Sequence, residues 1–351
     1  MRQNNIFLML LKVFFFSLIL VATSAVRAEL KVVTTIKPLH SLIANVMDGV
    51  GEPALLIEGS TSPHSFTLKP SHAKLLEEAD IIFWVGESIE TFMERPLESI
   101  VKNAEVVEFM EVESINKLKF REVSIFEDHD DHDNHDDHDD HDDHDDHDDN
   151  DDHDEHDDHD EHDDNDDHDE HDDHSGHDDH GHGHGEFDAH IWLDPMNAKE
   201  MVHEIAHELG DLDPANKNKY EANAQATIQA LDQLINDIEK GINKDAKFVV
   251  FHDAYQYFEE RFETRAAGAL TLNTDVLPGA KQIADIQDVI KDRGIKCIFS
   301  EPQFNPKIIT TIAEDMNIKT GVFDPLGANI DSNKDLYFKL IQNLGNELKG
   351  C

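Results

Sequence analysis

The order of apolar and polar positions predicts alternating strands and helices in the first part of the chain. Short β-branched and aromatic runs predict strands, and apolar residues three and four positions apart predict helices. Strands are expected at 30–36, 54–57, 81–85 and 105–109, and helices at 39–47, 71–78 and 89–100. This alternation predicts an α/β fold built on a mostly parallel sheet, with helices on both of its faces.

A long helix and a second alternating series follow near the middle of the chain. One apolar stripe recurs every three or four positions, at Ala224, Ile228, Leu231, Ile235, Ile238 and Ile242. We expect this helix to begin at Pro214, with Asp213 as its N-cap, and to reach about 40 Å at roughly 1.5 Å per residue. That is longer than one small domain needs, so the helix is expected to join two domains. Further strands are expected at 248–251, 266–270, 297–300 and 321–323, and helices at 255–262, 281–291, 306–316 and 336–348.

Residues 127–186 interrupt the pattern. They hold 34 acidic residues, 18 histidines and no Lys or Arg, and they contain no large apolar side chain. The net charge of −48 comes largely from this segment, since the remaining chain carries 43 acidic against 29 basic residues. A stretch that buries no apolar surface cannot offset its ordering entropy, so we expect a disordered loop.

Imidazoles three positions apart on such a loop predict several weak, exchanging zinc sites. The alternative is a solubilising tract, but Asp and Glu alone would serve that purpose. The auxiliary ligands are then His129, His132, His135, His138, His141, His144, His147, His153, His156, His159, His162, His168, His171, His174, His177, His180, His182 and His184.

The first 28 residues have the pattern of a secretory signal peptide. Arg2 and Lys12 supply positive charge, residues 13–22 are largely apolar, and small residues precede an expected cleavage after Ala28. The alternative is a buried or membrane-anchoring helix. Cleavage places a soluble mature protein in the periplasm. No Cys lies at the cleavage site, so no lipid anchor is expected.

The chain has two cysteines, Cys297 and Cys351. An even pair in an oxidising compartment predicts one disulfide, and the alternative is two free thiols. Closing this loop is worth roughly 4 kcal/mol in the loop-entropy model. No basic patch suggests a nucleic-acid partner.

Four candidate ligands follow predicted strands or lie in loops between elements: His64, His190, His252 and Asp324. In open α/β sheets, ligands bind beyond the carboxyl ends of the strands. Two candidates come from each half of the chain, so a cleft between two domains would collect them. Three imidazoles with a carboxylate or water in a tetrahedral arrangement suit Zn²⁺.

The segments around these residues resemble the ZnuA-type solute-binding proteins of zinc ABC importers. They are Ser62-Pro63-His64-Ser65-Phe66-Thr67-Leu68-Lys69-Pro70-Ser71, His190-Ile191-Trp192-Leu193-Asp194-Pro195, Phe251-His252-Asp253-Ala254-Tyr255-Gln256-Tyr257-Phe258, Ser300-Glu301-Pro302-Gln303-Phe304 and Phe323-Asp324-Pro325-Leu326-Gly327. The resemblance covers residues 30–351 apart from the His/Asp loop. It implies two four-stranded lobes bridged by a rigid helix, with the metal between them and the loop beside its entrance.

The resemblance also implies a function. The protein would be a periplasmic monomer, not an enzyme, that binds Zn²⁺ as transported ligand and delivers it to the permease of an ABC importer. The expected division is a signal peptide at 1–28, a first lobe at 29–213, a linker helix at 214–242 and a second lobe at 243–351. A zinc buffer or metallochaperone is the non-transport alternative.

The ligands that the resemblance implies are His64, His190 and His252. Relatives that carry manganese have a carboxylate where this chain has His252, and an imidazole there favours zinc because Mn²⁺ prefers harder oxygen ligands. Some zinc-binding relatives have Glu before the first His, where Pro63 stands here. That leaves Asp324 or water as the fourth ligand, and we favour Asp324.

One motif suggests a different function. Residues 203–213, His-Glu-Ile-Ala-His-Glu-Leu-Gly-Asp-Leu-Asp, resemble the metzincin protease motif with Asp in place of its third His. The apolar positions of this predicted helix share one face, which places His203 and His207 toward solvent rather than in a cleft. Gly210 is expected as the helix C-cap. The protease interpretation is therefore disfavoured.

Overall fold

The computed structural model describes residues 29–126, 186–272, 274 and 278–351. The predicted signal peptide and the auxiliary loop histidines lie outside the described residues. Within these ranges, no helix combines the length and the apolar character that crossing a membrane requires.

The first sheet has four parallel strands in the order β2-β1-β3-β4. The strands are β1 (Val32–Thr34), β2 (Ala54–Leu55), β3 (Ile81–Trp84) and β4 (Glu105–Glu108). The helices that accompany them are α2 (Lys37–Val46), α3 (Pro70–Glu78) and α4 (Glu94–Ser99), with short 3₁₀ turns η2 (Thr91–Met93) and η3 (Phe109–Glu111). The two central strands are buried throughout, which is why they appear in the sequence as continuous apolar runs. We call this sheet and its helices the first lobe.

The second sheet repeats this arrangement in the order β6-β5-β7-β8, again with all strands parallel. Its strands are β5 (Phe248–His252), β6 (Ala269–Thr271), β7 (Cys297–Ser300) and β8 (Lys319–Val322). Its helices are α7 (Gln256–Arg261), α8 (Ala280–Asp292), α9 (Lys307–Met316) and α10 (Leu336–Gly350). We call this sheet and its helices the second lobe. The predicted α/β class with two four-stranded parallel sheets is confirmed.

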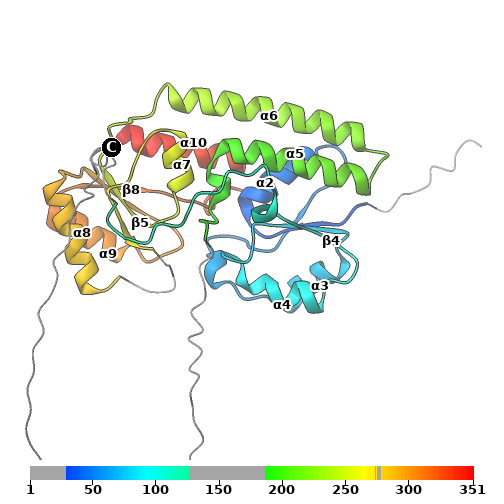
Figure 1. Cartoon of the computed structure of the whole chain (residues 1–351), viewed down its shortest axis with the longest axis horizontal. Coiled ribbons are helices and arrows are strands. Elements are labelled where there is room, and N and C mark those ends of the chain that lie inside the picture. Colours follow the sequence, from blue (N-terminus) through cyan, green and yellow to red (C-terminus); the bar gives the residue numbers. More distant parts are fainter. Residues whose placement is uncertain (1–28, 127–185, 273, 275–277) are drawn as a thin grey trace, which may run out of the picture. The chain divides into compact units, whose positions relative to one another are not determined.

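Two long helices, α5 (Pro195–Leu212) and α6 (Lys217–Glu239), pack against each other. Figure 1 shows α6 running along α5, and α6 also contacts α2 and α10. The predicted start of α6 is wrong: it begins at Lys217, and Pro214 lies in the preceding turn. The Asp213 side chain instead accepts hydrogen bonds from Asn216 Nδ2 at 2.6 Å and Tyr220 Oη at 3.2 Å, which closes the turn between the helices.

The prediction for Gly210 is also wrong, because α5 continues to Leu212. A Cβ at Gly210 would lie 3.0 Å from Lys217 Cγ. This glycine therefore permits the close approach of α6 to α5 rather than ending the helix.

A segment before the polar interruption pairs with the second sheet. Ala269 N donates to Ser124 O at 2.8 Å and Phe126 N donates to Ala267 O at 3.1 Å, with an antiparallel bridge between Ile125 and Gly268. Residues 124–126 thus add a short antiparallel pairing to the edge of the second sheet.

The predicted disulfide is confirmed. Cys297 in β7 is bonded to Cys351, with the two Cα atoms 5.8 Å apart and the residues separated by 54 positions. The bond fastens the end of α10 to a central strand of the second sheet.

Candidate metal centre

Three histidines from three separate elements come together. His64 lies in the short turn η1 (Pro63–Ser65) after β2, His190 directly precedes η5 (Ile191–Leu193), and His252 is the last residue of β5. Each offers one ring nitrogen, and these atoms lie within 4.8 Å of one another. Among the described residues this is the one group of three or more His, Cys, Asp or Glu side chains with that geometry.

The spacing of two of the ligand nitrogens matches zinc coordination. His190 Nε2 and His252 Nε2 are 3.3 Å apart. Two ligands of a tetrahedral ion with bonds of about 2.0–2.1 Å lie about 3.3–3.4 Å apart. The His64 ring completes the cluster, with its centroid 5.6 Å from that of His190 and 6.0 Å from that of His252. One ion can therefore reach all three imidazoles.

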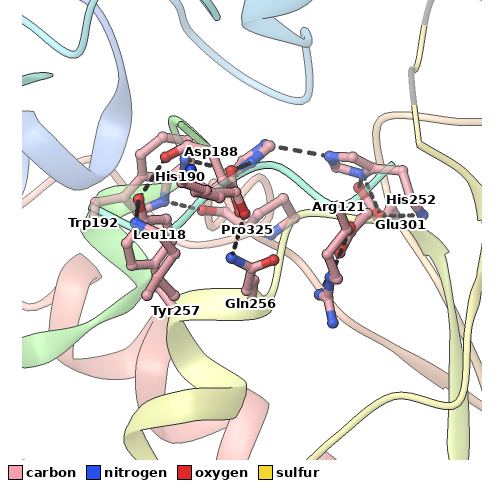
Figure 2. A network of polar contacts seen from close by, with 12 residues as sticks. Leu118, Arg121, Asp188, His190, Trp192, His252, Gln256, Tyr257, Glu301 and Pro325 are labelled. Atoms are coloured by element: carbon pink, nitrogen blue, oxygen red, sulfur yellow. Dashed lines mark hydrogen bonds and ion pairs between the residues drawn. The ribbon is translucent and has the colours of Figure 1, made fainter. Parts of the chain in front are cut away.

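Two buried carboxylates orient the rings. Asp188 Oδ1 lies 2.7 Å from His190 Nδ1, and both oxygens of Glu301 lie 2.7 and 2.8 Å from His252 Nδ1 (Figure 2). A carboxylate oxygen beside a metal-binding imidazole accepts a hydrogen bond from Nδ1–H, which leaves the Nε2 lone pair to face the ion. Two lone pairs that face each other at this distance repel unless a cation lies between them. The site is therefore arranged for a metal ion.

The cavity at the cluster is small. Ile89, Trp192, Phe304 and Leu326 contribute apolar walls beside the imidazoles. The cavity volume is about 10 Å³, which is room for one ion or water molecule and for no organic substrate. Bonds between an ion and its ligands are stronger in such a low-dielectric site than in water.

A second layer of polar contacts holds the residues beside the ligands. Tyr257 Oη donates to the backbone oxygen of Asp188 at 2.6 Å and accepts from Leu118 N at 2.9 Å (Figure 2). Arg121 forms ion pairs with Asp253, the neighbour of His252, and with Glu259. Burial raises the pKa of Asp253 to about 7, although the Arg121 charge opposes this shift. The segment before the polar interruption thus braces both sides of the histidine cluster.

The structure does not group Asp324 with the three histidines. One oxygen, Oδ1, accepts from Leu326 N at 3.2 Å and from Gln303 Nε2 at 3.1 Å, and the other accepts from Ala328 N at 2.6 Å. Gln303 lines the cavity, so the carboxylate lies just behind the cavity wall. To bind an ion through Oδ1, the carboxylate would have to exchange one of the two donors on that oxygen for the metal.

The protease-like motif lies on α5, away from this cluster. The apolar positions Ala198, Met201, Val202, Ile205 and Leu209 are buried, as expected, whereas His203 and His207 are exposed. No described cavity collects these two imidazoles with a third ligand.

Sequence reasoning missed the two orienting carboxylates. Asp188 stands two residues before His190, and this short spacing could have predicted the contact between the carboxylate and the imidazole. Glu301 was part of a recognised segment, but it is 49 residues from His252. Only the pairing of β5 with β7 brings them together, so no local pattern could identify the contact.

Comparison with known proteins assigns the family. A family model described as "Zinc-uptake complex component A periplasmic" matches residues 32–351. The chain belongs to this family. The high-affinity zinc uptake system protein ZnuA of Brucella abortus (strain 2308) is 46% identical over 322 residues, covering 91% of each chain. The ZnuA protein of Haemophilus influenzae is 37% identical over 331 residues, covering 94% of this chain and 95% of the relative.

Solved structures show the same fold. A crystal structure of ZnuA matches with a TM-score of 0.66 at 18% identity, covering 92% of this chain and 98% of the other. The family consists of solute-binding proteins for zinc transport rather than enzymes, which confirms the predicted family and class of function.

Proposed function

We propose that this protein captures Zn²⁺ in the cavity between its two lobes and delivers it to the membrane permease of an ABC importer. His64, His190 and His252 bind the ion. The observation that carries the proposal is the convergence of three imidazoles, two of them with Nε2 atoms 3.3 Å apart and with their Nδ1 atoms held by carboxylates. The names of the relatives support zinc as the cargo and the periplasm as the compartment.

The charges of the site suit reversible binding of a divalent cation. An imidazole contributes no charge when it binds a metal ion, and the carboxylates of Asp188 and Glu301 lie directly behind two of the three ligands. Together these carboxylates balance the two charges of the ion without occupying its coordination sphere. Buried charge is tolerated only when it is compensated in this way, and carboxylates behind the ligands also make the imidazoles stronger donors.

Nitrogen donors also account for the choice of metal. Three imidazoles suit Zn²⁺, whereas Mn²⁺ prefers carboxylate and water oxygens. We propose Asp324 for the fourth position, with water as the alternative, because the carboxylate lies behind the cavity wall next to Gln303. Coordination through Oδ1 requires Gln303 Nε2 or Leu326 N to leave that oxygen, while Oδ2 keeps the amide of Ala328.

We further propose the division of the chain into a signal peptide at 1–28, two lobes at 29–213 and 243–351, and a joining helix within 214–242. The His/Asp segment 127–186 serves as an auxiliary collector of zinc. Its 18 imidazoles among 34 carboxylates support weak, exchanging binding that raises the local supply of the ion.

Zinc titration in competition with a chelator of known affinity tests the binding site. His64→Ala, His190→Ala and His252→Ala are each expected to weaken the tightest site by about 100-fold or more, since one of three strong ligands is lost. His203→Ala with His207→Ala is the matched control on the exposed face of α5, and it should leave that site unchanged. Loss of the tight site in the control pair alone would contradict the assignment. Delivery is tested separately: zinc-limited growth should require both this protein and the permease.

A further inference from the structure

One buried lysine joins the two lobes beside the metal cavity. Lys37 is the first residue of α2 in the first lobe, and it is 4% exposed. Its Nζ donates to three backbone oxygens of the second lobe: Gly327 O at 2.6 Å, Ala328 O at 3.0 Å and Ile330 O at 2.7 Å. Three acceptors require the protonated amine, because a neutral amine has only two N–H groups.

The acceptor loop, residues 324–330, presents three of its carbonyls to this charge. Gly327 has φ +66°, a value that favours glycine, and the turn at this residue directs the three carbonyls toward one point. Carbonyl dipoles that converge in a buried place repel unless a cation lies among them. Asp324 satisfies the amides of Leu326 and Ala328 on the same loop. One buried cation and one carboxylate therefore hold the loop together.

The same loop forms part of the cavity wall. Pro325 and Leu326 line the cavity, and Pro325 O accepts a hydrogen bond from Trp192 Nε1 at 2.8 Å. The Trp192 ring lies 5.3 Å from the His190 ring. The loop is thus held against the metal site from two directions, by Lys37 and by Trp192.

We propose that Lys37 is a positioning residue for zinc retention. Its ammonium group acts as a built-in monovalent cation in a cradle of three carbonyls, and it keeps the 324–330 loop in place over the ion. The lysine belongs to one lobe and the carbonyls to the other, so any opening that separates them must break three charge-assisted hydrogen bonds. This inference rests on the proposed function, in which the three imidazoles hold zinc.

Zinc release from the full-length protein tests the role of Lys37. The protein is loaded with zinc and mixed with an excess of a fluorescent chelator, and the slowest phase is assigned to the cavity by its disappearance in His252→Ala. Lys37→Ala should accelerate that phase by about tenfold or more, the scale expected for lost charge-assisted hydrogen bonds. Lys334→Ala is the matched control: its Nζ pairs with Asp48 Oδ1 at 2.6 Å, but both side chains are about half exposed. It should leave the rate unchanged.

Chemical rescue separates positioning from general loosening. Propylammonium, which matches the three carbons and the amine removed by Lys37→Ala, should restore slow release in that variant because it can refill the cradle, whereas propanol should not. Lys37→Met fills the same space without the charge, so it should release zinc as fast as Lys37→Ala and resist rescue. Unchanged slow release in both Lys37 variants overturns the proposal, and so does an acceleration in Lys37→Ala that propylammonium does not reverse. If His252→Ala retains the slow phase, it is the proposed function that fails.

Discussion

Replacing Glu301 by Gln gives a sharp test of how the site achieves its affinity. Glu301 is 3% exposed, and its two oxygens lie 2.7 and 2.8 Å from His252 Nδ1. Gln has nearly the same shape but no charge. It can also turn its NH₂ group toward Nδ1, which moves the imidazole proton to Nε2 and removes the lone pair that binds the metal.

The magnitude follows from this role. Loss of a carboxylate behind a metal-binding histidine costs about 10- to 100-fold in metal affinity, or about 1.4–2.7 kcal/mol. We expect Glu301→Gln to fall in this range, well short of the loss in His252→Ala, because the imidazole itself remains. Asp188→Asn, which changes the corresponding contact at His190, should behave in the same way.

The assay is competitive zinc titration of four proteins: the wild type, Glu301→Gln, His252→Ala and the double variant Glu301→Gln/His252→Ala. If Glu301 acts through His252, it has little further effect once His252 is gone, so the two losses should not add. A change of less than twofold in Glu301→Gln would refute the reasoning. Fully additive losses in the double variant would also refute it, because they would show that Glu301 acts independently of His252.

Further predictions concern stability, metal choice and capacity. Burial raises the pKa of the Glu90 carboxyl from 4.5 to about 7. Between pH 4.5 and 7 the folded chain therefore keeps a proton that the unfolded chain loses. The free energy of unfolding should fall by up to about 3 kcal/mol as the pH rises through this range. Glu90→Gln should not show this loss. Urea unfolding of the zinc-free wild type and variant at pH 5 and 8 measures the difference, and an equal loss of unfolding free energy in both proteins would contradict the prediction. Cys297→Ser with Cys351→Ser opens a loop of 54 residues and should cost about 4 kcal/mol of unfolding free energy, whereas no loss would show that the bond is dispensable. His252→Glu should shift the Zn²⁺/Mn²⁺ preference toward Mn²⁺ in competition titrations, and an unchanged ratio would remove this account of selectivity. Deleting residues 127–185 should remove the weakly bound zinc counted by equilibrium dialysis and leave the tightest site intact; full capacity in the deletion variant would end the auxiliary role of the segment.

Most strands could be predicted because they are short, apolar and bounded by polar residues. The exception is β8 (Lys319–Val322), which is mostly exposed and was predicted two residues late, at 321–323. β7 was placed at its observed limits, Cys297–Ser300. The three histidines could be predicted because each follows a strand or lies in a connecting loop, where parallel sheets collect ligands. The sequence pattern was informative wherever the position of a residue depends only on the strand, helix or loop that contains it.

The errors and omissions have a different origin. The start of α6 was misplaced because Asp213 and Pro214 form a good local cap, but the side chain of Asp213 bonds to Asn216 and Tyr220 across the turn. The three acceptors of Lys37 lie about 290 residues away in sequence. The Lys37 contacts arise from the packing of one lobe on the other, and no periodic pattern in either segment predicts them.

The position of the bound ion tests the central claim most directly. Crystals of the full-length protein loaded with one equivalent of zinc should be measured at the zinc absorption edge. The account predicts one strong anomalous peak about 2.0–2.2 Å from the ligand nitrogens of His64, His190 and His252. A peak between His203 and His207 on α5, with none at the three-histidine cluster, would contradict it.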